Sequence, residues 1–379
     1  MPRFLHTADW QIGKLFGQFD ADEAALLADE RFNAVERLAQ LAAVHAVDAV
    51  LVAGDVFDAQ TVTDRTLHRL FHALGGFSGR WVMIPGNHDA ALAESVWTRA
   101  ARLDAIPANL TVCLSPEPLL LDDARVALLP APLTQRNTHA DLTEWFAAAD
   151  TPAGYLRVGL AHGSVQGILA EDIDSANPIA AGRAASARLD YLALGDWHGT
   201  REIDPRTWYA GTPETDRFRA NASGQALLVD IAAPGAPPVV TPVVTGRYRW
   251  HSAGAELQVP SDLDLLLERL AAFGPADVVQ MEVSGRTDLA GHRRLTDALA
   301  QAQGRARSLV ADLAALQLEP TEADIEALAA DGYLADVVGE LQAAQRANDP
   351  ARAEAARDAL ALLAGLLAAR RPAAGGQAQ

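Results

Sequence analysis

Short apolar runs that stop at polar, glycine-containing segments are the main pattern along the first half of the chain. The runs are "RFLHTAD", "VDAVLVAGD", "RWVMIPGNHD", "LRVGLAHG" and "DYLALGDWHG". Each is typical of a buried strand in a parallel sheet, which reads as a continuous apolar stretch. Helices are predicted between the first three runs, over Ala21–His45 and Thr61–Leu74, because apolar residues there recur at helical spacing. Strands alternating with helices predict βαβ units and a mainly parallel sheet.

The later part of the chain predicts further elements. The runs "ARVALLPA", "TWYAG" and "QALLVDIA" have little helix between them, so we expect a second, more antiparallel sheet and a layered sandwich. The proline-rich segment 233–244 is expected to be an edge strand or a linker. Helices near 262–273 and 288–303 and strands near 277–285 and 308–316 predict a small α/β module. From residue 321 the pattern is helical and ends in a tail predicted to be disordered.

Length and composition set broad limits. A chain of 379 residues suggests more than one domain. The single cysteine, Cys113, excludes an intramolecular disulfide and favours the cytoplasm. No leader and no apolar stretch of membrane-spanning length is found, so we expect no membrane contact. Lys14 is the only lysine among 31 basic residues, which we attribute to a GC-rich genome.

The net charge of −18 argues against a nucleic-acid partner until its distribution is considered. Residues 1–150 carry −9 and residues 251–379 carry −8, whereas residues 151–250 carry only −1. In that middle part, arginines between 201 and 249 alternate with aromatic residues between 197 and 250, a pattern suited to phosphates and bases. Arginines that solvate a loop-rich surface explain the same pattern.

Each predicted strand delivers a polar side chain at its carboxyl end. These are Asp9, Asp55, Asn87 with His88, His162, and Asp196 with His198. One histidine at a strand end is usually structural, but parallel strands bring their carboxyl ends to the same edge of a sheet. So many carboxylates and imidazoles in one place would be costly without bound cations.

The segments "LHTADWQIGK", "AGDVFDAQ", "IPGNHD", "GLAHG", "YLALGDWHG" and "YAGTP" resemble the calcineurin-like metallophosphoesterases, and among them the SbcD-type DNA repair nucleases. The resemblance covers about residues 3–218. It implies a four-layer α/β/β/α sandwich over 1–245, a small α/β capping domain over 246–320 and C-terminal helices over 321–379.

The resemblance also implies a centre with two divalent ions, manganese most favoured and magnesium possible. Its ligand positions match Asp9, Gln11, Asp55, Asn87, His162, Asp196 and His198, with Asp55 bridging both ions. His88 matches the histidine near the scissile phosphate. Asp58 is expected to be an acidic residue that supports the metal ligands without binding the metal itself. The ions would hold the phosphate and activate a water for phosphodiester hydrolysis.

Two positions depart from the family pattern. The family has D-x-H where this chain has Asp9-Trp10-Gln11, and G-H-x-H where it has Gly195-Asp196-Trp197-His198. Oxygen ligands at Gln11 and Asp196 would suit manganese or magnesium, with the Gln11 ion held more weakly. The alternative is that Gln11 is an ordinary loop residue and Asp196 no longer coordinates. Trp10 and Trp197 are expected to pack beneath the site.

The function predicted from this resemblance is a DNA exonuclease or endonuclease subunit that works with an SbcC-like ATPase, with a homodimer possible. One alternative is a phosphoesterase for nucleotides or cyclic nucleotides, and another is a catalytically weakened scaffold that binds DNA or an ATPase. Apolar stripes at Leu334–Leu341 and Leu360–Leu367 fit either a partner surface or two helices packed on each other.

Overall fold

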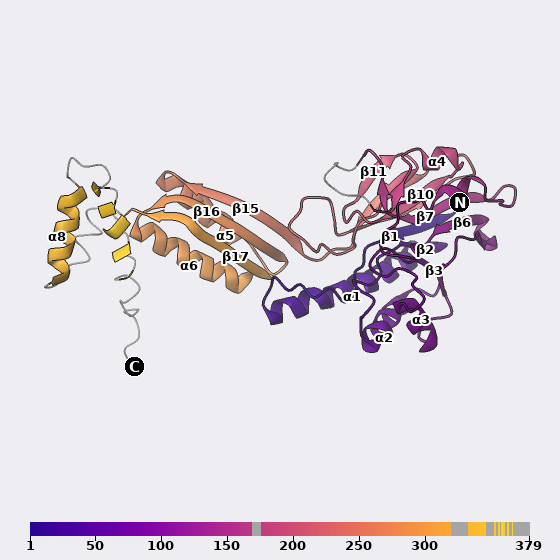
Figure 1. Cartoon of the computed structure of the whole chain (residues 1–379), viewed down its shortest axis with the longest axis horizontal. Helices are drawn as coiled ribbons and strands as arrows, with labels where there is room; N and C mark the ends of the chain where they lie inside the picture. Colours follow the sequence, from indigo (N-terminus) through magenta and orange to yellow (C-terminus); the bar gives the residue numbers. More distant parts are fainter. Residues whose placement is uncertain are drawn as a thin grey trace. The chain divides into compact units, whose positions relative to one another are not determined.

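The computed structural model describes residues 1–168, 176–319, 333–345, 352–353, 355–356, 358–360, 362–363 and 366. The chain folds into two compact units, Met1–Arg249 and Trp250–Gln379 (Figure 1). The predicted helices over 321–332, Leu367 and the predicted disordered tail lie outside the described residues. A separate domain that starts at residue 321 therefore stays a prediction.

The first unit contains a six-stranded sheet in the order β14-β13-β1-β2-β3-β4. Its strands are β1 (Arg3–Thr7), β2 (Ala49–Ala53), β3 (Arg80–Ile84), β4 (Leu110–Val112), β13 (Gln225–Asp230) and β14 (Val239–Val244). The strands β1 to β4 are parallel, and β13 and β14 add antiparallel strands at one side. The proline-rich segment is thus an edge strand, as one of its two interpretations predicted.

A second six-stranded sheet has the order β11-β12-β10-β7-β6-β5. Its strands are β5 (Leu119–Leu121), β6 (Val126–Ala131), β7 (Leu156–His162), β10 (Tyr191–Gly195), β11 (Arg201–Asp204) and β12 (Thr207–Tyr209). The prediction of a more antiparallel sheet was wrong, because β6, β7, β10 and β12 are parallel and only the edges are antiparallel. The segment "QALLVDIA" belongs to the first sheet instead.

Apolar side chains show how the layers stack. Phe4, Leu51 and Val82 of the first sheet pack against Leu128 and Val158 of the second, so the two sheets lie face to face. The outer face of the first sheet is covered by α1 (Ala21–Val44), α2 (Asp64–Ala73) and α3 (Val96–Arg102). The outer face of the second sheet is covered by η3 (Glu144–Ala147) and α4 (Arg183–Ser186). The predicted α/β/β/α sandwich is confirmed.

The remaining elements of the first unit are short. They are η1 (Leu74–Gly76), η2 (Asp122–Ala124) and the two-stranded sheet of β8 (Ser164–Val165) and β9 (Pro178–Ile179). His6 on β1 joins the two sheets, with Nδ1 2.9 Å from the Tyr191 hydroxyl and Nε2 3.2 Å from the Leu194 carbonyl oxygen. Burial lowers the pKa of His6 to about 3, so the ring is neutral and structural.

The second unit holds a three-stranded sheet in the order β15-β16-β17. Its elements are β15 (Arg249–Leu257), α5 (Pro260–Ala272), β16 (Asp277–Thr287), α6 (Leu289–Arg305), β17 (Ser308–Leu318) and α8 (Tyr333–Gln345). Apolar residues of α5 and α6 pack on the sheet, as the predicted small α/β module requires. No helix within the described ranges is long and apolar enough to cross a membrane.

The apolar stripes near the C-terminus are partly explained by packing. Val338 on α8 and Leu360 are buried in one cluster, with Leu341 and Leu363 against it. Leu362 and Leu366 are 69% and 67% exposed. Packing between helices therefore accounts for some of the apolar residues, and a partner surface at the exposed leucines stays a prediction.

Candidate metal centre

The polar residues that follow the central strands of both sheets meet at one place in the first unit. Single ligand atoms from Asp9, Asp55 and His162 lie within 4.8 Å of one another. These residues come from the ends of β1 and β2 in the first sheet and of β7 in the second, so the centre is built from both sheets. All three residues are at most 2% exposed. Buried carboxylates and an imidazole this close together form a donor set suited to a divalent cation.

The backbone at these strand ends is held in the left-handed region. Asp9, Gln11, Asp55 and Asp196 have φ values of 54°, 43°, 52° and 102°. Such conformations cost energy for residues other than glycine and concentrate at functional sites. Gly86 is needed for a different reason, because its backbone lies very close to Asp55. A Cβ at position 86 would be 2.2 Å from Asp55 Oδ1. The glycine after β3 thus allows its loop to touch the Asp55 carboxylate.

His162 is oriented for coordination through Nε2. Its Nδ1 lies 2.8 Å from the Ala53 carbonyl oxygen and donates to it, which turns Nε2 toward the centre. That nitrogen lies 3.1 Å from Asn87 Oδ1, 3.5 Å from Asp55 Oδ1 and 3.7 Å from Asp196 Oδ1. Four of the predicted ligand residues therefore face one small volume.

Asp9 and Asp196 are joined through the backbone. The Asp196 amide donates to both carboxylate oxygens of Asp9, at 3.1 and 3.2 Å. Burial raises the pKa of Asp9 to about 6, against the opposing effect of His198 and His162. A cation next to such a buried carboxylate strongly stabilises its ionised form.

Gln11 and His198 bond to each other and to partners outside the group of Asp9, Asp55 and His162. Gln11 Nε2 is 3.1 Å from His198 Nε2, and Lys14 Nζ is 3.1 Å from Gln11 Oε1. His198 Nδ1 lies 3.0 Å from Asp216 Oδ2. Their coordination of an ion stays a prediction.

His88 lies at the open side of the centre, with a side chain 28% exposed. Its Nδ1 is 2.7 Å from the Asp58 carbonyl oxygen, and its Nε2 is 4.0 Å from Asp55 Oδ2. Asp58 was predicted to act through its carboxyl group, and the contact found here is through its main chain. A functional role for the Asp58 carboxyl group stays a prediction.

Sequence reasoning missed two supporting residues. Asp89 is fully buried and accepts from the amides of Gly86, Val56 and Phe57 at 2.6, 3.0 and 3.2 Å, which ties the loop after β3 to the loop after β2. In the sequence, the one indication of this role was that Asp89 is the last residue of "GNHD".

Arg31 on α1 is the second missed residue and is 2% exposed. Its guanidinium donates to the carbonyl oxygens of Asp9, Trp10 and Glu214 and to the Thr212 hydroxyl. It therefore fixes the loop that carries Asp9 and Gln11. No motif marked it, because its partners are mostly main-chain atoms.

The two tryptophans next to the centre differ. Trp10 is 1% exposed and packs against Trp81, which confirms its predicted packing role. Trp197 is half-buried, and the guanidinium carbons of Arg219 and Arg201 lie 4.7 and 5.8 Å from its ring centroid. Cations over an aromatic ring beside the centre fit the predicted phosphate- and base-contacting surface.

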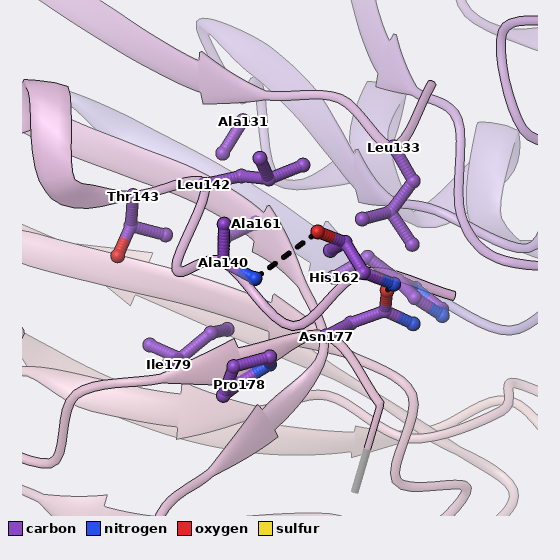
Figure 2. Close-up of a pocket in the computed structure, with 11 residues that line it drawn as sticks. Ala131, Leu133, Ala140, Leu142, Thr143, Ala161, His162, Asn177, Pro178 and Ile179 are labelled. Atoms are coloured by element: carbon purple, nitrogen blue, oxygen red, sulfur yellow. Dashed lines mark hydrogen bonds between the residues drawn. The ribbon is translucent and has the colours of Figure 1, made fainter. Parts of the chain in front are cut away.

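A small pocket lies next to His162 (Figure 2). It has a volume of about 10 Å³ and is lined mostly by apolar side chains, among them Leu133, Leu142 and Ile179. Space of that size holds a water molecule at most. A phosphoester substrate must therefore reach the centre from elsewhere.

Metal binding is expected to depend on pH through His162. Burial alone would lower the pKa of His162, but the carboxylates of Asp55, Asp9 and Asp196 raise it to about 9 in the metal-free chain. An ion must displace that proton, so Mn²⁺ affinity should rise about tenfold per pH unit from pH 6 to 9 and then level off. Calorimetry at pH 7.5 in buffers of different ionisation enthalpy should show release of about one proton. An affinity that is constant over that range would contradict the expectation.

Comparisons with known proteins agree with this arrangement. Residues 2–228 match the family described as calcineurin-like phosphoesterase. The SbcD subunit of nuclease SbcCD from Rhodobacter capsulatus is 27% identical over 333 residues, which cover 72% of this chain and 78% of that protein. The protein of the same name from Escherichia coli K12 is 38% identical over 100 residues, 24% of this chain and 23% of that protein. DNA double-strand break repair protein Mre11 of Methanosarcina acetivorans is 24% identical over 300 residues, 76% of this chain and 46% of that protein.

Proposed function

The chain belongs to the calcineurin-like phosphoesterases, metal-dependent hydrolases of phosphoester bonds, and from this premise we propose that it cleaves phosphodiester bonds in DNA. The observation that carries the proposal is the gathering of Asp9, Asp55 and His162 from three strand ends. The relatives named as SbcCD and Mre11 proteins support DNA as the substrate.

The residues present fit a divalent ion. Asp9, Asp55, Asn87 and His162 would hold it, with Asp196 beside them. When bound, such an ion polarises a phosphate and makes a water a better nucleophile. Because carboxylate and amide oxygens dominate the donor set, we propose manganese, with magnesium as the alternative. The second ion of the predicted pair would need Gln11 and His198, whose side chains bond to other groups.

His88 has a role that needs no direct bond to the metal. The bond from Nδ1 to the Asp58 carbonyl leaves Nε2 facing the Asp55 carboxylate at the open side of the centre. We infer that Nε2 meets the phosphate there and stabilises charge or protonates the leaving oxygen. Arg219 and Arg201 over Trp197 would contact neighbouring phosphates.

The wider setting is also part of the proposal. One relative is named as a DNA repair protein and others as a subunit of nuclease SbcCD, which supports a role in DNA repair together with a further subunit. We propose that this subunit is an SbcC-like ATPase and that the protein works in the cytoplasm. Assembly as a homodimer belongs to the same hypothesis. The exposed Leu362 and Leu366 are residues at which the ATPase could dock.

Digestion of linear duplex DNA tests the function. The purified chain with Mn²⁺ should shorten or cut the duplex, and chelation of the metal should stop the reaction. A chromogenic phosphodiester tested in parallel separates the alternatives. Turnover of that small ester without cleavage of DNA would favour a small-substrate enzyme, and a chain that binds no ion and hydrolyses neither would be a scaffold.

A further inference from the structure

Four side chains beside Asp9 form a closed ring of hydrogen bonds, which we call the Lys14 ring. Lys14 Nζ lies 3.1 Å from Gln11 Oε1 and 2.7 Å from Asp216 Oδ2. Gln11 Nε2 lies 3.1 Å from His198 Nε2, and His198 Nδ1 lies 3.0 Å from Asp216 Oδ2. Three of the four residues are at most 8% exposed, and the Lys14 side chain is 22% exposed.

The donors and acceptors of the four ring members by themselves fit one direction around the ring. If the Gln11 amide were turned over, its NH₂ group would face the Lys14 ammonium, and two donors would meet. The carbonyl oxygen of Gln11 therefore accepts from Lys14, and its NH₂ donates to His198 Nε2. The ring proton of His198 is then on Nδ1 and is donated to Asp216. Each of these donors meets an acceptor, so the ring is complete by itself.

Positive charge surrounds the Asp216 carboxylate. Lys14 Nζ lies 2.7 Å from Asp216 Oδ2, and Arg217 Nε lies 3.1 Å from Asp216 Oδ1. Arg217 Nη2 also lies 2.8 Å from His198 Nδ1 and 3.2 Å from His198 Nε2. The Lys14 ring therefore contains an ammonium group paired with a buried carboxylate, with a second cation next to it.

The hydrogen bonds of the Lys14 ring occupy the atoms that a metal ion beside Gln11 and His198 would need as ligands. The two atoms expected to coordinate there, Gln11 Oε1 and His198 Nε2, already accept hydrogen bonds from Lys14 and Gln11. A divalent cation at Gln11 Oε1 would also lie close to the ammonium, and like charges repel strongly where they are shielded from water. Across the described part of the chain, one group of histidine, cysteine or acidic side chains lies close enough to hold an ion, Asp9, Asp55 and His162, and it includes neither His198 nor Asp216.

We propose that the centre binds one divalent ion, at Asp9, Asp55, Asn87 and His162, and that the Lys14 ammonium supplies the positive charge where a second ion was predicted. The proposal rests on the proposed function, since it concerns the same centre. Two of the three N–H groups of Lys14 donate within the ring, and the third can donate to a phosphate oxygen. A lysine in this place acts as a point charge on the substrate.

The test counts ions in the full chain without substrate. Calorimetry with Mn²⁺ alone should give one ion per chain, and the electron paramagnetic resonance spectrum should be that of an isolated Mn²⁺. A double variant, Gln11→His with Lys14→Met, removes the ammonium and restores an imidazole ligand. It should bind two ions and show a spin-coupled spectrum.

The single variants test the charge itself. Lys14→Met should lower turnover of a phosphodiester about 100-fold or more while the Mn²⁺ dissociation constant stays within about threefold. Lys14→Arg, which keeps the charge, should retain much more of the rate. Arg69→Met removes an exposed cation from α2, paired with Asp29, and serves as the matched control with wild-type turnover.

Two results would overturn the proposal: two Mn²⁺ ions in the unaltered chain, or full turnover in Lys14→Met. Because the ion count is made on the unaltered chain, the folding of a variant does not decide it. A chain that binds one isolated ion but never cleaves DNA would support this inference and remove the proposed function, so the two can fail separately.

Discussion

Replacement of Asp55 by asparagine should abolish metal-dependent turnover, by roughly 10³-fold or more, since a metal ion contributes several kcal/mol to such reactions and each 1.4 kcal/mol is a factor of ten. The change keeps the size of the side chain and an oxygen that can accept from the His88 amide, now 2.9 Å from Asp55 Oδ1. Asparagine also tolerates the left-handed backbone found at this position. What is lost is the negative charge between Asp9 and His162.

The stability of the metal-free variant separates this loss from misfolding. The Asp55 charge raises the pKa of both Asp9 and Asp89, so it destabilises their ionised forms. Above pH 9, where His162 has lost its proton, Asp55→Asn without metal should therefore melt at a higher temperature than the wild type. At neutral pH, Mn²⁺ should no longer raise its melting temperature. A variant that still gains stability from Mn²⁺ as the wild type does would show that Asp55 is not a ligand.

A buried carboxylate away from the centre provides the control. Asp190 is 5% exposed and accepts from the amides of Arg157 and Gly235, at the opposite end of β10 from Asp196. Asp190→Asn should lower the free energy of unfolding, because it replaces an acceptor with a donor group in a buried site. Its affinity for Mn²⁺ should equal that of the wild type.

The strand ends were the most predictable part of this molecule. A buried parallel strand has a clear sequence pattern, and its carboxyl end has a known position in the sheet. For that reason Asp9, Asp55, Asn87 and His162 could be placed together from the sequence, and the structure brings them together. The pattern predicted a layered sandwich, and the family resemblance implied its four-layer order.

Strand direction in the second sheet was less predictable. The runs "ARVALLPA", "TWYAG" and "QALLVDIA" have little helix between them, which suggested a more antiparallel sheet. In the structure β6 and β12 pair in parallel with β7 and β10, and their connections are mostly loops and short 3₁₀ turns. A loop that crosses back over a sheet leaves no periodic signal in the sequence, so the direction could not be found there.

The Lys14 ring shows a second limit. Lys14 and Asp216 are 202 positions apart, and neither residue was itself matched to a ligand position, although Lys14 ends the segment "LHTADWQIGK". The available signal was that the chain has one lysine among 31 basic residues and that this lysine follows the altered Gln11 by three positions. On the proposal above, that lysine supplies positive charge next to Gln11, where the family pattern has an imidazole.

Replacement of His88 by alanine should leave the metal in place and lower turnover about 10²- to 10³-fold, the range of a lost acid or base group. His88 Nε2 lies 4.0 Å from Asp55 Oδ2, next to the centre and outside the group of Asp9, Asp55 and His162. Calorimetry should therefore give the wild-type Mn²⁺ affinity, and phosphodiester hydrolysis should show the loss. A variant with weakened metal binding would make His88 a ligand, contrary to this assignment.

His88→Asn distinguishes the chemistry of the ring from its contact with the main chain. An asparagine amide can still donate to the Asp58 carbonyl oxygen, which His88 Nδ1 contacts at 2.7 Å, but it has nothing in place of Nε2. If Nε2 acts on the phosphate, His88→Asn should be as slow as His88→Ala. If the ring only holds the Asp58 loop, His88→Asn should regain most of the rate, and the catalytic role given to His88 would be lost.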